Sequence, residues 1–247
     1  MLHTLNGLLL ALSLAVIAGG LWHRDRLPGP ERLLEAIRAE PGQQPVARPP
    51  FEVTVSDVRY TVRPLYRYEL RGLVVSRHDT SAWWDVVHRD WWKDHLNVAD
   101  VCVVWGGNLD GGLYRDLVYW SETFTCHAAP RTPEAGRRFD PQAISNNHLL
   151  TDDPRLAKLL RRMRPGDQIA IEGWLAEYSH QTGMAFHRGT STRRDDQGNG
   201  ACETIWVTGA RVLRTANAGW RSALTAGGFG VAAAVLLWLV LPVRVRG

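Results

Sequence analysis

The sequence predicts a β-rich α+β domain, shaped like a small β-barrel with one internal helix, between two membrane-spanning helices. Two uncharged apolar segments, 5–22 and 222–242, lie near the two ends of the chain. Between them, over 51–215, apolar and polar residues mostly alternate, which is typical of half-buried strands. One stretch in this region instead repeats apolar residues at helical spacing. These three observations define the predicted fold class.

Each terminal segment is long enough to cross a bilayer. About twenty apolar residues, rising about 1.5 Å each, span a hydrocarbon core of about 30 Å. For the first segment the alternatives are a buried helix or a cleaved export signal, although residues 1–6 lack the Lys or Arg of a typical signal. We therefore predict a two-pass membrane protein. Gly227, Gly228 and Gly230 in the second segment favour close helix pairing, which would allow a homo-oligomer.

The sequence gives conflicting indications of the side of the membrane on which the domain lies. The domain-side flanks carry seven arginines, whereas the outer tails carry only Arg244 and Arg246. The positive-inside rule then favours the cytoplasm, but it weakens for a loop of about 200 residues. Cys102 and Cys126 lie in two strand-like segments, and a disulfide between them would require an oxidising compartment. We expect a periplasmic domain, with three buried thiols as the alternative.

Residues 23–50 are predicted to connect the first span to the domain. Residues 28–38 carry apolar side chains at helical spacing and predict a short amphipathic helix. Residues 41–50 contain four prolines, which fix φ and remove backbone donors, so an extended linker is expected. From Phe51 the alternation predicts strands as far as Ser76.

The segment 83–95 holds four tryptophans and two histidines. On a helix, Trp84, His88, Trp91 and His95 would follow one stripe. This stripe suggests an aromatic platform for a sugar, a base or a lipid headgroup, and the ordinary alternative is packing of a helix against a sheet. His88 and His95, with Asp85 or Asp94 nearby, are alternative metal ligands. On a helix the two histidines would lie about 10.5 Å apart along the axis, so they could share a metal only if the segment is not a regular helix. We expect no metal and no cofactor.

Two further strands are predicted at 98–105 and 117–126. The glycine-rich stretch 106–112 between them lacks the Lys and Ser or Thr of a phosphate-binding loop, so we interpret it as a hairpin connection.

The internal helix is predicted at 154–164, after a polar stretch. The strand that follows, 167–178, has Gly173 near its centre, which lets a strand bend sharply. The last strands are predicted within 201–213. About seven short strands with one helix resemble an oligonucleotide/oligosaccharide-binding (OB) fold.

Five short motifs occur in the second half of the domain: SNNH at 145–148, RPGD at 164–167, GWL at 173–175, GTSTRRDD at 189–196 and GNGACE at 198–203. Together they resemble the signature of an uncharacterised bacterial membrane-anchored protein family. The resemblance covers about residues 60–210 and implies a bacterial envelope protein, which we expect in the inner membrane. The family has no known activity, so it assigns no catalytic residue.

The same motifs supply a candidate catalytic site. A Cys nucleophile needs a His base and an orienting group, roles that Cys202, His148 and either Asn147 or Asp195 would fill. Such a site would hydrolyse an envelope substrate or transfer a group from it. No nucleophile motif of a known family surrounds Cys202, and polar residues in such turns are usually structural. Arg193 is a candidate ligand-binding residue, together with the aromatic stripe.

The net charge of +4 does not indicate nucleic-acid binding. Residues 51–215 hold 21 Lys and Arg and 21 Asp and Glu, so the excess charge lies near the membrane. We expect no nucleic-acid partner. The predicted function is a membrane-tethered module that recognises an envelope glycan or a protein partner. The alternative is a Cys/His-dependent hydrolase or transferase acting on an envelope substrate.

Overall fold

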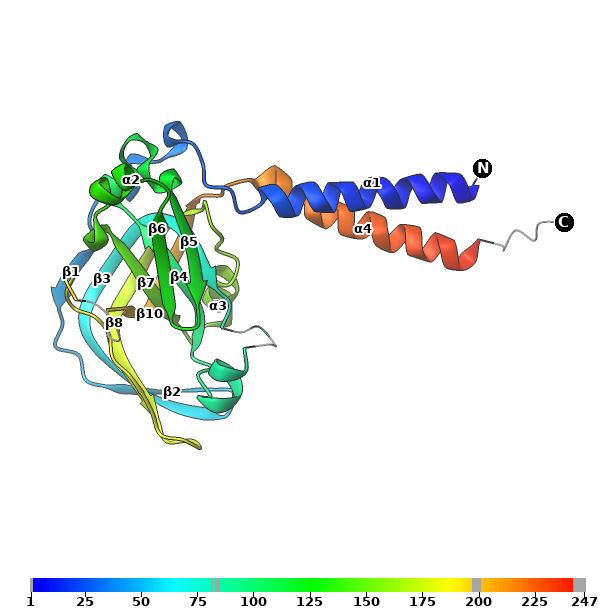
Figure 1. The fold of residues 1–247 in the computed structure, drawn as a ribbon. Helices are drawn as coiled ribbons and strands as arrows, with labels where there is room; N and C mark the ends of the chain where they lie inside the picture. The colour runs from blue at the N-terminus through cyan, green and yellow to red at the C-terminus, as the bar shows by residue number, and fades with distance from the viewer. Residues whose placement is uncertain (1, 81, 83–84, 197–200, 242–247) are drawn as a thin grey trace. The chain divides into compact units, whose positions relative to one another are not determined.

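The computed structural model describes residues 2–80, 82, 85–196 and 201–241 (Figure 1). Trp84, one of the predicted ligand-binding residues, lies outside this part of the chain. The chain divides into two compact units. One unit combines residues 1–26 with 215–247, and the other spans 27–214.

The first unit consists of two long helices. α1 spans Leu2–His23 and α4 spans Ala218–Val240, so each begins a few residues earlier than the predicted segment. Both helices are long and apolar enough to cross a membrane. The two helices pack against each other, and Asn6 Nδ2 donates a hydrogen bond to the carbonyl oxygen of Ala234 at 3.0 Å.

Glycines of α4 permit this close packing. A Cβ on Gly227 would lie 2.8 Å from Ile17 Cγ1, and one on Gly230 would lie 2.2 Å from Ser13 Oγ. A Cβ on Gly228 would have no described atom within 4 Å. Two of the three glycines predicted to favour oligomerisation therefore serve packing within one chain, because small residues let helix backbones approach closely.

The second unit is β-rich and contains an eight-stranded sheet and a two-stranded hairpin. The large sheet is formed by β1 (Gly42–Pro45), β2 (Phe51–Val55), β3 (Val58–His78), β4 (Asn97–Val104), β7 (Ile144–Leu150), β8 (Gln168–His180), β9 (Phe186–Arg188) and β10 (Glu203–Arg214). The hairpin consists of β5 (Leu117–Glu122) and β6 (Thr125–Pro130). The helices are α2 (Pro133–Arg138) and α3 (Pro154–Leu160), with short helical turns at Pro30–Arg32, Glu35–Ile37, Val87–Trp91, Gly106–Asp116 and Pro141–Ala143.

Within the large sheet, the strands β3, β4, β7, β8 and β10 each pair with two others of these five. β3 is antiparallel to both β4 and β8, and β4 is antiparallel to β7. β10 runs antiparallel to β8 and parallel to β7. The internal helix α3 lies in the connection from β7 to β8. The predicted β-rich architecture with an internal helix is therefore confirmed.

The interior is apolar and closely packed. Tyr68, Leu70, Val101 and Leu149 are among its fully buried members and come from β3, β4 and β7. The strands predicted from Val58 to Ser76 form one continuous strand, because a register irregularity at its prolyl residue, Pro64, preserves its pairing with β8.

Gly173 is required where β8 meets β10. A Cβ at this position would lie 2.1 Å from the carbonyl oxygen of Trp206, so no other residue fits without displacing a strand.

The segment predicted to be a linker is packed onto the sheet. The helix expected at 28–38 is replaced by two three-residue 3-10 turns, because Leu34 between them has extended dihedrals of −80° and 141°. Ile37 is fully buried. The proline-rich stretch is extended as expected, and its residues Gly42–Pro45 pair with β3.

The helix predicted at 83–95 is wrong for the described residues. Val87–Trp91 forms a single π-helical turn. His88 is fully buried, whereas Trp91 is 64% exposed, so the two side chains do not share one face. The predicted aromatic stripe is therefore not formed.

The strand predicted at 117–126 is instead a hairpin that turns at Phe124. Cys102 of β4 and Cys126 of β6 are joined by a disulfide, with their Cα atoms 5.8 Å apart. Because β5 and β6 form a separate sheet, the bond fastens this hairpin to the large sheet rather than linking paired neighbours.

Candidate functional site

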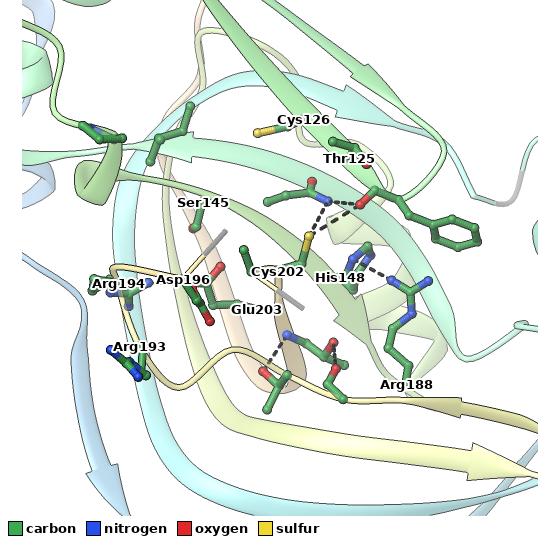
Figure 2. Close-up of a pocket in the computed structure, with 18 of the residues that line it drawn as sticks. Thr125, Cys126, Ser145, His148, Arg188, Arg193, Arg194, Asp196, Cys202 and Glu203 are labelled. Carbon is green, nitrogen blue, oxygen red and sulfur yellow. Dashed lines mark hydrogen bonds and ion pairs between the residues drawn. The ribbon is translucent and has the colours of Figure 1, made fainter. Parts of the chain in front are cut away.

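A pocket of about 940 Å³ lies over β7 (Figure 2). The tip of the β5–β6 hairpin lines one part of it, and residues within 188–196 and 201–204 line another. Trp92, from the connection between β3 and β4, also contributes. The walls therefore come from segments that are far apart in the sequence.

Phe124, at the tip of the hairpin, is the most constrained residue of the pocket. Its φ of 70° is rare for an aromatic residue. Its ring stacks on Trp92 at a centroid distance of 4.7 Å, and the guanidinium of Arg188 lies 4.3 Å from the ring centroid. Its carbonyl oxygen accepts a hydrogen bond from Asn146 Nδ2 at 3.0 Å. The hairpin tip is thus fixed against the large sheet from several sides.

His148 is held by a buried carboxylate. It lies directly opposite Asp100 in the pairing of β7 with β4, and its Nδ1 is 2.7 Å from Asp100 Oδ1. Asn97 Nδ2 donates to the same oxygen at 2.7 Å. Burial alone would raise the pKa of Asp100, but the charge and hydrogen bond of His148 lower it to about 2. Asp100 is therefore ionised at neutral pH.

The other ring nitrogen of His148 faces a guanidinium. Arg188 Nη1 lies 2.7 Å from His148 Nε2. A guanidinium only donates, so Nε2 accepts, Nδ1–H donates to Asp100, and the imidazole is neutral in this arrangement. Burial lowers the pKa of His148, whereas the charge and hydrogen bond of Asp100 raise it to about 9. Protonation of His148 would break its contact with Arg188, because Nε2–H of a cationic ring and the guanidinium N–H are both donors.

Cys202 contacts the hairpin tip and a side chain of β7. Its Sγ lies 3.6 Å from Asn146 Nδ2 and 3.5 Å from the carbonyl oxygen of Phe124. A thiol donates to that carbonyl, whereas a thiolate would be repelled by it. The thiol therefore helps to hold the hairpin tip in the described geometry.

The predicted orienting groups of a catalytic site do not meet His148. Asn147 points away from the pocket, because successive residues of a strand face opposite sides, and its Nδ2 donates to the carbonyl oxygens of Val101 and Ser145. Asp195 is exposed and binds Arg193 through two contacts of 2.9 and 2.8 Å. The group that orients His148 is Asp100, 48 residues away in the sequence, which sequence reasoning missed.

An ion pair between Arg194 and the buried Glu203 also lines the pocket. Arg194 also donates from Nη2 to Tyr68 Oη at 2.6 Å. Burial raises the pKa of Glu203 to about 7, against the opposing charge of Arg194. Burial likewise raises the pKa of Tyr68, so its hydroxyl stays protonated.

Of the described residues that were predicted to bind a ligand, one lines the pocket. Arg193 lines the pocket, whereas Trp91 and His88 do not. Trp92 supplies the tryptophan of the pocket instead. His88 packs behind the hairpin tip, with its ring centroid 4.3 Å from that of Phe124.

Three pocket residues carry buried polar atoms without a hydrogen-bond partner in the described part of the chain. They are Asn146 Oδ1, Arg188 Nε and Glu203 Oε2. Buried polar groups are rarely left unpaired, so each atom calls for a partner such as a water or a ligand. The set offers one cationic donor and two acceptors.

Comparisons with protein-family models, curated proteins and solved structures found no match. This outcome agrees with the resemblance to an uncharacterised family that has no known activity. Because a fold by itself does not define a function, the function of this chain has to be inferred from the chemistry of its pocket.

Proposed function

We propose that this protein is a membrane-tethered binding module of the bacterial envelope, and that its pocket binds an acidic glycan. The observation that carries the proposal is the unpaired set formed by Asn146 Oδ1, Arg188 Nε and Glu203 Oε2. A sugar presents many hydroxyl donors, and an acidic sugar adds an anion. The hydroxyl donors would pair with the two acceptors, Asn146 Oδ1 and Glu203 Oε2, and the anion would pair with the guanidinium of Arg188.

Arg188 is the cation best placed to bind an anion. Arg193 is paired with Asp195, and Arg194 is paired with Glu203. Among the described residues, Arg188 forms no ion pair with a carboxylate; it contacts the ring of His148 and stacks on Phe124. An arginine binds carboxylate or phosphate through parallel donors, so an acidic group in the pocket would complete its pairing.

The position of the pocket agrees with an OB-like barrel, the finer fold that we propose for residues 27–214. Its five strands would be β3, β4, β7, β8 and β10, and the parallel pairing of β7 with β10 supports this order. OB folds bind oligosaccharides and oligonucleotides on their second and third strands and on the loops after the first and fourth. Here Asn146 and His148 come from the third strand, while Trp92 and Arg188 come from those two connections.

The envelope location of the proposal is supported by two features. α1 and α4 are long and apolar enough to cross a membrane. The disulfide between Cys102 and Cys126 favours an oxidising compartment, since such bonds persist outside the cytoplasm. A periplasmic domain tethered at both ends would meet envelope glycans at the membrane surface.

The test uses the full chain in detergent, dialysed against the muropeptides released by enzymatic digestion of peptidoglycan. We expect the wild type to retain muropeptides with free carboxylates, detected by mass spectrometry. Arg188→Gln should lose this retention, while Arg59→Gln, which changes an exposed arginine outside the pocket, should keep it. Absence of retention by the wild type, or equal retention by Arg188→Gln, would contradict the proposal.

A Cys/His-dependent hydrolase is the second candidate, favoured by the Asp100–His148 pair beside Cys202. In the described geometry, however, Arg188 occupies the nitrogen that a base would use, and the thiol faces a carbonyl oxygen. The rate at which iodoacetamide alkylates Cys202 in the folded protein separates the two candidates. A rate far above that of free cysteine would favour the hydrolase, whereas a slow rate favours the structural thiol.

A further inference from the structure

Two histidines and one aspartate converge outside the pocket. His78 ends β3, while Asp85 and His88 belong to the connection after that strand. Asp85 Oδ2 lies 2.7 Å from His78 Nε2 and 2.7 Å from His88 Nδ1. One ligand-type atom from each residue falls within 4.8 Å of the other two.

The cluster is largely withdrawn from solvent. The side chain of Asp85 is 3% exposed and that of His88 is 0% exposed, while that of His78 is 19% exposed. A buried carboxylate is costly unless a cation or several donors compensate its charge. The partial exposure of His78 leaves one side through which an ion can reach the group.

The carboxylate is oriented by its other oxygen. The backbone N–H of His88 donates to Asp85 Oδ1 at 3.1 Å, which turns Oδ2 towards the two rings. Hydrogen bonds of this kind fix the ligands of metal sites from outside. The two imidazole nitrogens and Oδ2 therefore lie close to one common position, and a backbone hydrogen bond as well as side-chain contacts keeps them there.

We propose that His78, Asp85 and His88 bind one divalent transition-metal ion, specifically Zn²⁺. Two imidazole nitrogens and one carboxylate oxygen match the ligand preferences of Zn²⁺, with water as the fourth ligand. Zn–N and Zn–O bonds of about 2.0–2.2 Å place ligand atoms roughly 3.3 Å apart, so the present contacts must widen slightly. His78 is free to rotate outward because it is the most exposed of the three.

The ion would link the connection between β3 and β4, which carries Asp85 and His88, to His78 at the end of β3. His88 packs on Phe124, the tip of the hairpin, so order imposed at the metal reaches the back of the pocket. The metal site is nevertheless separate from the proposed glycan site, and either proposal can fail without the other.

The experiment uses the full chain in detergent, purified without a polyhistidine tag, stripped with a chelator and then titrated with ZnCl₂ alone. We expect calorimetry to give one high-affinity site per chain, and elemental analysis after dialysis to give one zinc per chain. His78→Gln should lose this site, whereas His187→Gln, a substitution of an exposed histidine on β9, should retain it.

A spectroscopic measurement on the wild type tests the site without depending on a variant that fails to fold. X-ray absorption at the zinc edge should show two imidazole ligands and low-Z oxygen ligands. Failure of the wild type to retain stoichiometric zinc would overturn the proposal. So would zinc retention by a folded His78→Gln variant, or a zinc spectrum without two imidazoles.

Discussion

Two aspartate–histidine pairs in this protein share the same contact but differ in what surrounds them. Asp100–His148 and Asp85–His88 are both buried, and in each an oxygen lies 2.7 Å from Nδ1. The first pair bridges two strands and meets Arg188 on its far side. The second lies within one connection and shares its carboxylate with His78. The strand pair holds the ring of His148 between a carboxylate and a guanidinium, whereas in the loop pair the carboxylate lies between two imidazole rings.

Removal of the strand pair should have the largest effect. Asp100→Ala leaves two buried donors, Asn97 Nδ2 and His148 Nδ1, without their acceptor, and each unsatisfied buried donor costs about 1–3 kcal/mol. Urea unfolding of the full chain, followed by far-UV circular dichroism, measures the loss. Asp152→Ala, at an exposed position, is the matched control and should leave the free energy of unfolding nearly unchanged.

Reduction of the disulfide should have the next largest effect. The bond joins Cys102 and Cys126, which are 24 residues apart in the sequence. Because it restricts the unfolded chain, it should add about 3 kcal/mol to the free energy of unfolding. The Cys102→Ser/Cys126→Ser double variant should unfold at correspondingly lower urea concentration than the wild type. It should also weaken glycan retention, because the hairpin that carries Phe124 loses its covalent link to β4. Retention equal to the wild type would show that the hairpin tip does not shape the pocket.

Acid should weaken the strand pair in a defined pH range. The pKa of Asp100 is lowered from 3.8 to about 2 by His148, against the effect of burial. A depressed folded-state pKa means that the stabilisation is present above pH 4 and is lost as the pH falls towards 2. The shift corresponds to about 2 kcal/mol. Unfolding measured between pH 2 and 5 should show this loss in the wild type, and Asp100→Asn should lack this component.

The protonation of His148 should depend on Arg188. In the wild type the guanidinium donates to Nε2 and its charge lowers the pKa of His148, while Asp100 raises that pKa. Arg188→Gln should therefore raise the pKa of His148, as followed by ¹⁵N imidazole shifts in histidine-labelled protein. An unchanged titration in the variant would mean that the Arg188 contact does not control the ring.

The smallest effect is expected at the exposed pair. Asp195 was a candidate orienting group, but it binds only the solvent-exposed Arg193. Exposed ion pairs contribute little to stability, so Asp195→Ala should leave the unfolding midpoint unchanged. It should also leave the alkylation rate of Cys202 unchanged, which would further separate Asp195 from that thiol.

The alternation of residues was enough to predict much of the sheet. The strand at 167–178 was expected with Gly173 at its bend, and β8 has this glycine against the backbone of β10. The internal helix was expected at 154–164 and ends earlier, at Leu160. Local patterns succeed here because apolar spacing and glycine geometry act over a few residues.

The site could be predicted only in part, because it depends on pairing between distant segments. His148 and Cys202 were named from their motifs, but the partner of His148 is set by the register of β7 on β4. Asn147 was named as an orienting group, but its side chain donates to the carbonyl oxygens of Val101 and Ser145, because successive residues of a strand face opposite sides. The tryptophan stripe failed because the chain makes one π-helical turn there instead of a regular helix.

The proposed function depends above all on Arg188 binding the anion of an acidic glycan. The sharpest measurement is calorimetric titration of the full chain with N-acetylmuramic acid and with N-acetylglucosamine, two sugars that differ by a lactyl carboxylate. A charge-assisted hydrogen bond contributes about 1.5–3 kcal/mol, so the wild type should prefer the acidic sugar by about tenfold or more. Arg188→Gln should lose this preference. Equal affinity of the wild type for the two sugars, or an unchanged preference in Arg188→Gln, would show that Arg188 does not bind the anion.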